Sequence, residues 1–136
     1  MPIKLVDIPG LDLPLDSKWQ VKALVIDGKS PALSALLEWK RKKPNDYKAI
    51  IKVLGFASLQ YRVVNEKHVK QSANKTHGEV FEAIAYRMKA RLMFFYDEEE
   101  ASLIICAYSY EKGRGNQNAA FEKCAIYRDF YLENKQ

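Results

Sequence analysis

The chain has 136 residues, of which 48% are hydrophobic, and this size allows one compact domain with its own core but hardly a second. The formal net charge of +5 suits a polyanionic partner such as RNA without requiring one, since many proteins with no such partner carry as much. The two cysteines, Cys106 and Cys124, form no CxxC motif or Cys/His cluster, so the composition argues against a disulfide framework and a zinc site.

The N-terminal segment is expected to be irregular. Residues 1–17 contain three prolines and a glycine among isolated hydrophobic residues, which predicts an extended arm lying on the body of the domain. Residues 19–27 are rich in β-forming side chains and alternate in part, which predicts a first strand that ends at Gly28.

Two helices are expected next, joined by a short connection as an antiparallel pair. Ser30 before Pro31 is typical of an N-cap followed by proline at the first helical position, and this helix should stop before Pro44. Asn45 can cap the second helix, and Gly55 suggests its end or a kink. The apolar stripes consist of Leu33, Leu36 and Leu37 in the first helix and of Tyr47, Ile50, Ile51 and Leu54 in the second.

Three strands and a helix are expected in the second half of the chain, after a stretch at 56–78 that has no clear pattern. A short strand or a loop near 61–64 is one option within that stretch. The later strands are expected at 79–86, 90–96 and 102–110, with the acidic residues 97–100 as the turn of the last hairpin. The final helix has an apolar stripe of Ala120, Cys124, Tyr127 and Tyr131.

This order of elements predicts an α+β fold: a small, mostly antiparallel sheet with an N-terminal helix pair and a C-terminal helix. Residues 1–136 should form this single domain. The chain starts without a basic segment followed by an apolar run, and no apolar stretch approaches the roughly 20 residues of a membrane span, so we expect a soluble, cytoplasmic protein.

Arg91 is the most unusual charged residue of a sequence that contains no common nucleotide-binding, hydrolase or metalloprotease motif. It lies in the otherwise apolar strand 90–96 and shares a face with Met93 and Phe95, because side chains alternate along a strand. A charge there must extend to solvent, pair with a carboxylate such as Glu82, or line a cleft. The sequence leaves the ion pair and the functional cleft about equally open.

Two groups of basic residues have both a structural and a functional interpretation. Cations at the end of the first helix complement the helix dipole or contact phosphate; they are Lys40, Arg41, Lys42 and Lys43. Lys112 and Arg114 alternate with glycines after the last strand, either as a flexible loop or as one whose backbone and charges approach a phosphate together. Tyrosines such as Tyr110 lie nearby and suit stacking on unpaired RNA bases, although several must belong to the core.

Ordered fragments between Lys70 and Tyr131 are similar to a known toxin family. They are Val69-Lys70 ahead of His77-Gly78, the strand start Val80-Phe81-Glu82, the strand 89–96 with its arginine, the apolar Ile104-Ile105-Cys106 that leads into Tyr110-Glu111-Lys112-Gly113-Arg114, and an alanine-containing helix at 119–131. Over slightly under half of its length, the chain thus resembles the RelE/HigB superfamily of toxins, particularly the phage-derived branch.

The resemblance implies a RelE-like toxin fold and a metal-independent endoribonuclease that cuts mRNA, usually in the ribosomal decoding site. In such enzymes the 2′-hydroxyl of the substrate attacks the adjacent phosphate, so neither a cofactor nor a metal is implied. The protein contributes cations, a base, an acid and stacking side chains. The partners implied are the mRNA, the ribosome and an antitoxin from a neighbouring gene, with no membrane.

Carried over by position, Arg91 corresponds to the strand arginine that contacts the scissile phosphate, and Lys112 and Arg114 fall in the basic loop that also contacts it. Lys70 and Lys75 are the best matches to the lysines before the sheet. The resemblance therefore implies catalytic roles for Arg91, Lys112, Arg114 and Lys70, with Lys75 binding RNA.

Two departures from the family pattern bear on activity. Ile84 stands where the family often has arginine, and Arg87 can substitute. The family also has a tyrosine or histidine near the start of the last helix. Residues 119–121 contain no counterpart, and Tyr110 can stack on the RNA instead. These departures keep open a degenerate member that only binds RNA or a partner protein. A ParE-like gyrase inhibitor without catalysis is a separate alternative.

Overall fold

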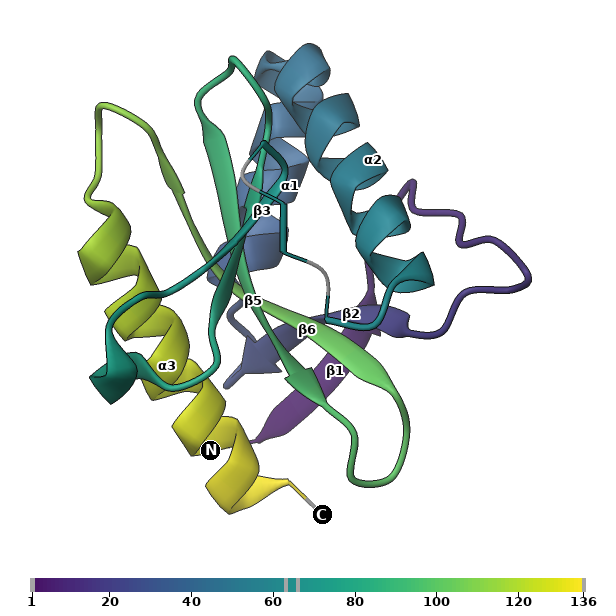
Figure 1. The fold of residues 1–136 in the computed structure, drawn as a ribbon, viewed down its shortest axis with the longest axis vertical. Helices are drawn as coiled ribbons and strands as arrows, with labels where there is room; N and C mark the ends of the chain where they lie inside the picture. Colours follow the sequence, from purple (N-terminus) through teal and green to yellow (C-terminus); the bar gives the residue numbers. More distant parts are fainter. Residues whose placement is uncertain (1, 63, 66, 136) are drawn as a thin grey trace.

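The computed structural model describes residues 2–62, 64–65 and 67–135, which form an α+β structure around one six-stranded sheet (Figure 1). The strands are β1 (Ile3–Asp7), β2 (Gln20–Ile26), β3 (Val69–Gln71), β4 (Phe81–Ile84), β5 (Ala90–Asp97) and β6 (Leu103–Glu111). The helices are α1 (Pro31–Lys42), α2 (Pro44–Leu59) and α3 (Gln117–Asn134), with a short 3₁₀ turn at Lys75–His77. None of the helices in the described ranges combines the length and apolarity that a membrane crossing requires.

The strands lie in the order β1-β2-β6-β5-β4-β3. β2 and β6 run parallel, and every other neighbouring pair is antiparallel. The predicted α+β class is therefore confirmed, with a mostly antiparallel sheet, a helix pair in the first half of the chain and a helix at its end.

The N-terminal segment differs from the predicted arm because residues 3–7 are a strand. β1 pairs with β2 along its whole length, with Leu5 opposite Leu24. Ile3 and Leu5 pack on one side of the sheet and Val6 on the other. A strand of five residues has too short an alternation to be recognised from the sequence, so this edge strand was not predicted.

The helix pair starts as predicted but continues differently. The Ser30 hydroxyl accepts a hydrogen bond from the Leu33 amide at 3.1 Å, and Pro31 occupies the first turn of α1. Asn45 does not cap α2, because Pro44 already occupies the first turn, where its missing amide costs nothing. Gly55 neither ends nor caps the helix, which continues to Leu59.

Two layers of helices cover the two faces of the sheet. Leu92 and Phe94 of β5 pack with the core under α1 and α2, whereas Met93 and Phe95 pack with the core under α3. Both cysteines are free and buried, with Cys106 in the first core and Cys124 in the second.

Helix α3 covers only part of its face of the sheet. The hairpin between β4 and β5 and the loop between β6 and α3 both extend past the first turn of α3 (Figure 1). The strand ends beyond that turn therefore have no helix above them on the α3 side.

Candidate functional site

A pocket of about 740 Å³ opens where α3 leaves the sheet uncovered. Five exposed cationic side chains line it: Lys67, Lys70, Arg87, Lys89 and Lys112. The buried Arg91 and the buried Glu82 lie deeper in the same pocket, together with Tyr110, Gln117 and the rim residue Tyr86.

The strand register explains why these side chains share one face. Residues opposite each other in neighbouring strands point to the same side of a sheet. Lys70 lies opposite Glu82, and Arg91 lies opposite both Ile84 and Tyr110. Because Glu82 and Ile84 are two residues apart in β4, all these positions face the α3 side.

Arg91 is 8% exposed and is held by the β4–β5 hairpin. Its Nη1 donates hydrogen bonds to the backbone carbonyls of Ala85 (3.4 Å), Met88 (2.9 Å) and Ala90 (2.9 Å). Within the described ranges it forms no ion pair, so the pairing with Glu82 considered from the sequence is not formed. The Nε and Nη2 edge makes no hydrogen bond to a described residue, which leaves it available to a ligand in the pocket.

Glu82 is 1% exposed and is the one acidic residue among the described residues that line the pocket. Its two oxygens accept hydrogen bonds from the Tyr110 hydroxyl at 2.7 Å and the Gln117 Nε2 at 2.9 Å. Burial raises the pKa of Tyr110, and the hydrogen bond to Glu82 raises it further, so the phenol stays protonated and acts as a donor. Each carboxylate oxygen keeps a second lone pair for another donor.

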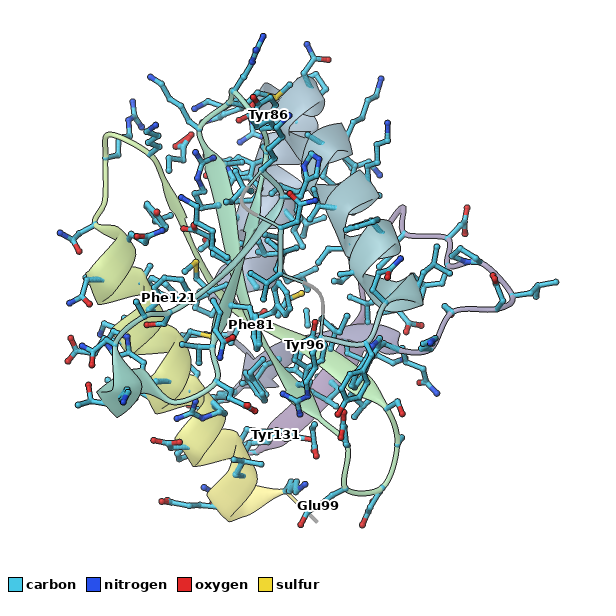
Figure 2. All side chains as sticks on the ribbon, viewed as in Figure 1. Phe81, Tyr86, Tyr96, Glu99, Phe121 and Tyr131 are labelled. Atoms are coloured by element: carbon cyan, nitrogen blue, oxygen red, sulfur yellow. The ribbon has the colours of Figure 1, made fainter. Side chains whose placement is uncertain are left out.

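The β4–β5 hairpin forms one wall of the pocket. Arg87 has a left-handed backbone (φ 63°), and the Asp46 carboxylate of α2 accepts hydrogen bonds from the amides of Lys89 (3.2 Å) and Ala90 (3.0 Å). Tyr86 lies at the outer end of the hairpin (Figure 2). The centre of its ring is 5.6 Å from the Lys67 Nζ and 5.3 Å from the Arg87 Cζ. The hairpin thus presents an aromatic ring and cations together.

The loop from Lys112 to Gly115 forms a neighbouring wall. The Lys112 amide donates to the Lys89 carbonyl at 2.8 Å, and the Arg114 amide closes a turn on the Glu111 carbonyl at 3.0 Å. Gly113 supplies the positive φ of 92° that this turn needs. The loop is therefore an ordered turn that brings Lys112 to the pocket, while the side chain of Arg114 is 82% exposed and does not line it.

The remaining predicted phosphate ligands lie outside the pocket. Lys75 belongs to the 3₁₀ turn, and the basic residues at the end of α1 contact side chains that do not line the pocket. Lys43 forms an ion pair with Glu111, Lys42 pairs with Glu38 at 3.1 Å, and Lys40 lies over the Tyr47 ring. The exposed Arg41 also lies away from the pocket lining.

The pocket therefore joins five of the residues singled out in the sequence: Lys70, Arg87, Arg91, Tyr110 and Lys112. Sequence reasoning missed Lys67, Lys89, Gln117 and the role of Glu82 in it. Glu82 had a signal, because it is the one charge in a strand that is otherwise apolar from Val80 to Ile84. Lys67, Lys89 and Gln117 belong to no recognisable sequence pattern, and only the folding of the chain brings them to the same pocket.

Among the described residues that line the pocket, six cations surround one carboxylate, which gives it a strongly positive character suited to an anionic ligand such as a phosphate group. No group of three or more His, Cys, Asp or Glu side chains with the geometry of a metal site occurs in the described part of the chain. No protein-family model matches the chain, and neither the curated proteins nor the solved structures compared with it contain a match.

Proposed function

We propose that this protein is the toxin of a toxin–antitoxin pair, an endoribonuclease that cleaves mRNA on the ribosome, in the cytoplasm, without a metal. The observation that carries the proposal is the convergence of Arg91, Lys70 and Lys112 on a pocket that also holds Glu82. An arginine edge and two ammonium groups bind and neutralise a phosphate, and a buried carboxylate beside them can take up a proton. The strand and loop fragments that carry these residues are also the ones that resemble the RelE/HigB superfamily, and this resemblance supports the RelE-like fold in the proposal.

In the proposed reaction, the 2′-oxygen of one nucleotide attacks the adjacent phosphorus while its proton passes to Glu82. The bond from phosphorus to the 5′-oxygen breaks, and the leaving oxygen takes a proton from an ammonium group at the pocket rim. The products are a 2′,3′-cyclic phosphate and a 5′-hydroxyl. The free edge of Arg91 stabilises the negative charge that develops on the phosphoryl oxygens, because a rigid donor pair needs no reorganisation at that moment.

The test is cleavage of a labelled single-stranded RNA, with and without ribosomes, in the presence of EDTA. We expect cleavage that survives the chelator and stops when the 2′-hydroxyl at the cut site is replaced by hydrogen. Glu82→Gln keeps the shape of the side chain and removes the base, so its rate should fall by about 100- to 10,000-fold. Cleavage of the 2′-deoxy substrate, or full activity of Glu82→Gln, would exclude this mechanism.

A second function has one specific observation in its favour. Both oxygens of Glu82 already accept a hydrogen bond, and no histidine is among the described residues that line the pocket. A degenerate member of the same toxin fold that binds RNA without cleaving it would need no free base. The two functions separate in the same assay, since the binder would retain intact RNA in a complex.

The proposed antitoxin should cover the basic pocket. Co-expression with the product of each adjacent gene, followed by affinity purification, should therefore recover a stable complex that neither binds nor cleaves RNA. A harmless protein that captures neither neighbour would speak against a toxin.

A further inference from the structure

The two edges of the six-stranded sheet differ in how their backbone groups are satisfied. β3 forms one edge, where the outward amide and carbonyl of Val69 both bond to the backbone of Asn65, each at 2.8 Å. β1 forms the other edge, and no such bridge is added to it by the described part of the chain. An open strand edge is a row of donors and acceptors that another strand can complete.

The register of β1 identifies the residues whose backbone faces outward. The Asp27 amide donates to the Pro2 carbonyl at 2.8 Å, so the backbone of Pro2 is directed towards β2. Because this direction alternates along an antiparallel strand, the amides and carbonyls of Ile3, Leu5 and Asp7 point away from β2. None of these groups bonds to another described residue.

Hollows flank β1 on both faces of the sheet. On the α1 side, a hollow of about 290 Å³ lies between Lys4 and Val6 of β1 and Leu33 and Leu37 of α1, and Leu37 is 47% exposed. On the α3 side, a hollow of about 560 Å³ lies between β1 and the C-terminal end of α3. A strand beside β1 therefore has room for its side chains on both faces.

We infer that β1 pairs with β1 of a second copy of this chain, in antiparallel orientation and centred on Leu5. The outward residues are placed symmetrically about Leu5, so Leu5 lies opposite its own counterpart and Ile3 lies opposite Asp7 of the other copy. Every outward amide then meets an outward carbonyl, and the two sheets continue as one. This inference goes beyond the proposed function and does not depend on it.

The charged side chains of β1 fit this register better than its neighbours. Like charges directly opposite each other destabilise a strand pair. A shift of two residues in one direction places Lys4 opposite Lys4, and a shift in the other direction leaves Ile3 without a partner in β1. In the inferred register Lys4 lies opposite Val6, where its aliphatic stem covers Leu37 and its ammonium group reaches solvent. Asp7 keeps Lys22 of its own copy as its partner.

Disulfide cross-linking tests the register. In the inferred dimer, Lys4 and Val6 of the two copies form a pair with no backbone hydrogen bonds between them, so their Cα atoms lie about 4.5 Å apart, within reach of a disulfide. A mixture of Lys4→Cys and Val6→Cys proteins should therefore form a linked dimer under mild oxidation. Each variant alone is the control, because the two copies of either position lie on a diagonal about 7–8 Å apart, too far to bridge. The native Cys106 and Cys124 are buried and should not react.

Sedimentation of the wild-type protein measures the association itself. A ladder of five residues buries little area, so we expect a dimer that dissociates on dilution. A monomer at all concentrations up to the sub-millimolar range would overturn the inference, and so would a dimer in which the mixture links no better than either variant alone. A chain that is monomeric by itself but pairs through β1 with the product of a neighbouring gene would also overturn it, because the edge would then belong to a different partner. The basic pocket contains Lys70 of the opposite edge, so RNA binding and cleavage are measured independently of this result.

Discussion

Arg91 and Glu82 line one pocket without pairing, and each is satisfied by uncharged groups. Removing a charge from water is costly unless hydrogen bonds replace the lost solvation. Three carbonyls perform this for one end of the Arg91 guanidinium, and a phenol and an amide perform it for Glu82. Because neither charge neutralises the other, Arg91 keeps its attraction for an anion.

Substitution of Arg91 should therefore affect both activity and stability. Arg91→Ala removes the Nε and Nη2 edge that holds the phosphate in the proposed reaction, which should slow RNA cleavage by about 100- to 1,000-fold. It also removes the Arg91 donor from three hairpin carbonyls, of which those of Ala85 and Ala90 keep a backbone amide, and this loss should lower the free energy of unfolding by about 1–3 kcal/mol. Single-turnover cleavage and thermal melting of the same samples measure the two effects.

Arg91→Lys is the matched control, because an ammonium can serve a carbonyl but cannot present a planar pair of donors. It should recover stability more than activity. A destabilised but fully active Arg91→Ala protein would remove Arg91 from the site and leave it a purely structural residue.

The sequence identified Arg91 because a single charge in an apolar strand needs an explanation. The same argument applied to Glu82, but that residue was considered only as the counter-ion of Arg91. Lys67 and Lys89 could not be found, because ordinary polar turns surround them and only the sheet order brings them beside Lys70 and Lys112. The side chain of Arg114 extends into solvent after the turn at Gly113 and lies outside the pocket lining, which the basic sequence of the loop could not indicate.

The loop between β6 and α3 positions Tyr110 through a close contact with Gly115. A Cβ atom at Gly115 would lie 3.1 Å from Tyr110 Cβ and Cδ2, closer than side chains normally approach. Gly115→Ala should therefore displace the phenol from Glu82, and losing this hydrogen bond should slow RNA cleavage by about tenfold.

Gly113→Ala is a useful comparison, because open space surrounds that position and only its positive φ resists a side chain. It should cost about 1 kcal/mol of stability and little activity. Cleavage rates and melting temperatures of both variants test this, and a fully active Gly115→Ala protein would contradict the role assigned to the contact.

The end of α3 is attached to β5 through Asp97, which is 7% exposed. Its carboxylate accepts hydrogen bonds from Tyr131 at 2.7 Å and Lys135 at 2.9 Å. Burial disfavours the charged form, but the hydrogen bonds from Lys135, the Glu99 amide and Tyr131 outweigh burial and hold the pKa of Asp97 below its ordinary value of 3.8.

A folded-state pKa below the unfolded value means that ionised Asp97 stabilises the protein above pH 3.8, and that this stabilisation is lost as the pH falls through the folded-state pKa. Asp97→Asn should accordingly melt below wild type at neutral pH. The difference in melting temperature should shrink in acid, and a difference that stays constant with pH would show that the charge of Asp97 is not involved.

Among the secondary-structure elements, the central strands of the sheet could be predicted from their own sequences, whereas the two edge strands could not. The three strands after residue 78 were predictable because each contains a run of apolar residues that a sheet can bury. The acidic residues between the last two strands then indicated the turn. β1 and β3 were not, since five and three residues carry little periodicity and pairing with a neighbour decides their structure. Asn45 was overinterpreted as a cap, because Pro44 already occupies the first turn of α2, and the predicted end at Gly55 is wrong, because the helix continues to Leu59.

Across the whole molecule the net charge is moderate, but six cations gather around one pocket. Binding of single-stranded RNA should therefore weaken with salt as counterions return to the phosphates. Lys112→Ala should reduce the slope of log Kd against log salt by about 0.7, the contribution of one phosphate contact. Lys18→Ala, which removes an exposed cation outside the pocket, should leave the slope unchanged; equal slopes for all three proteins would exclude a phosphate contact at Lys112.

The parallel pairing of β2 with β6 also sets an order of events during synthesis. β2 is made early, but its partner on the inner side of the sheet lies in the last quarter of the chain, as do Lys112 and Gln117. A growing chain can form the helix pair, whose contacts are local, long before it can close the sheet. The walls of the basic pocket therefore come together only after β6 and Gln117 have been synthesised, so a shorter nascent chain would not yet have the complete pocket.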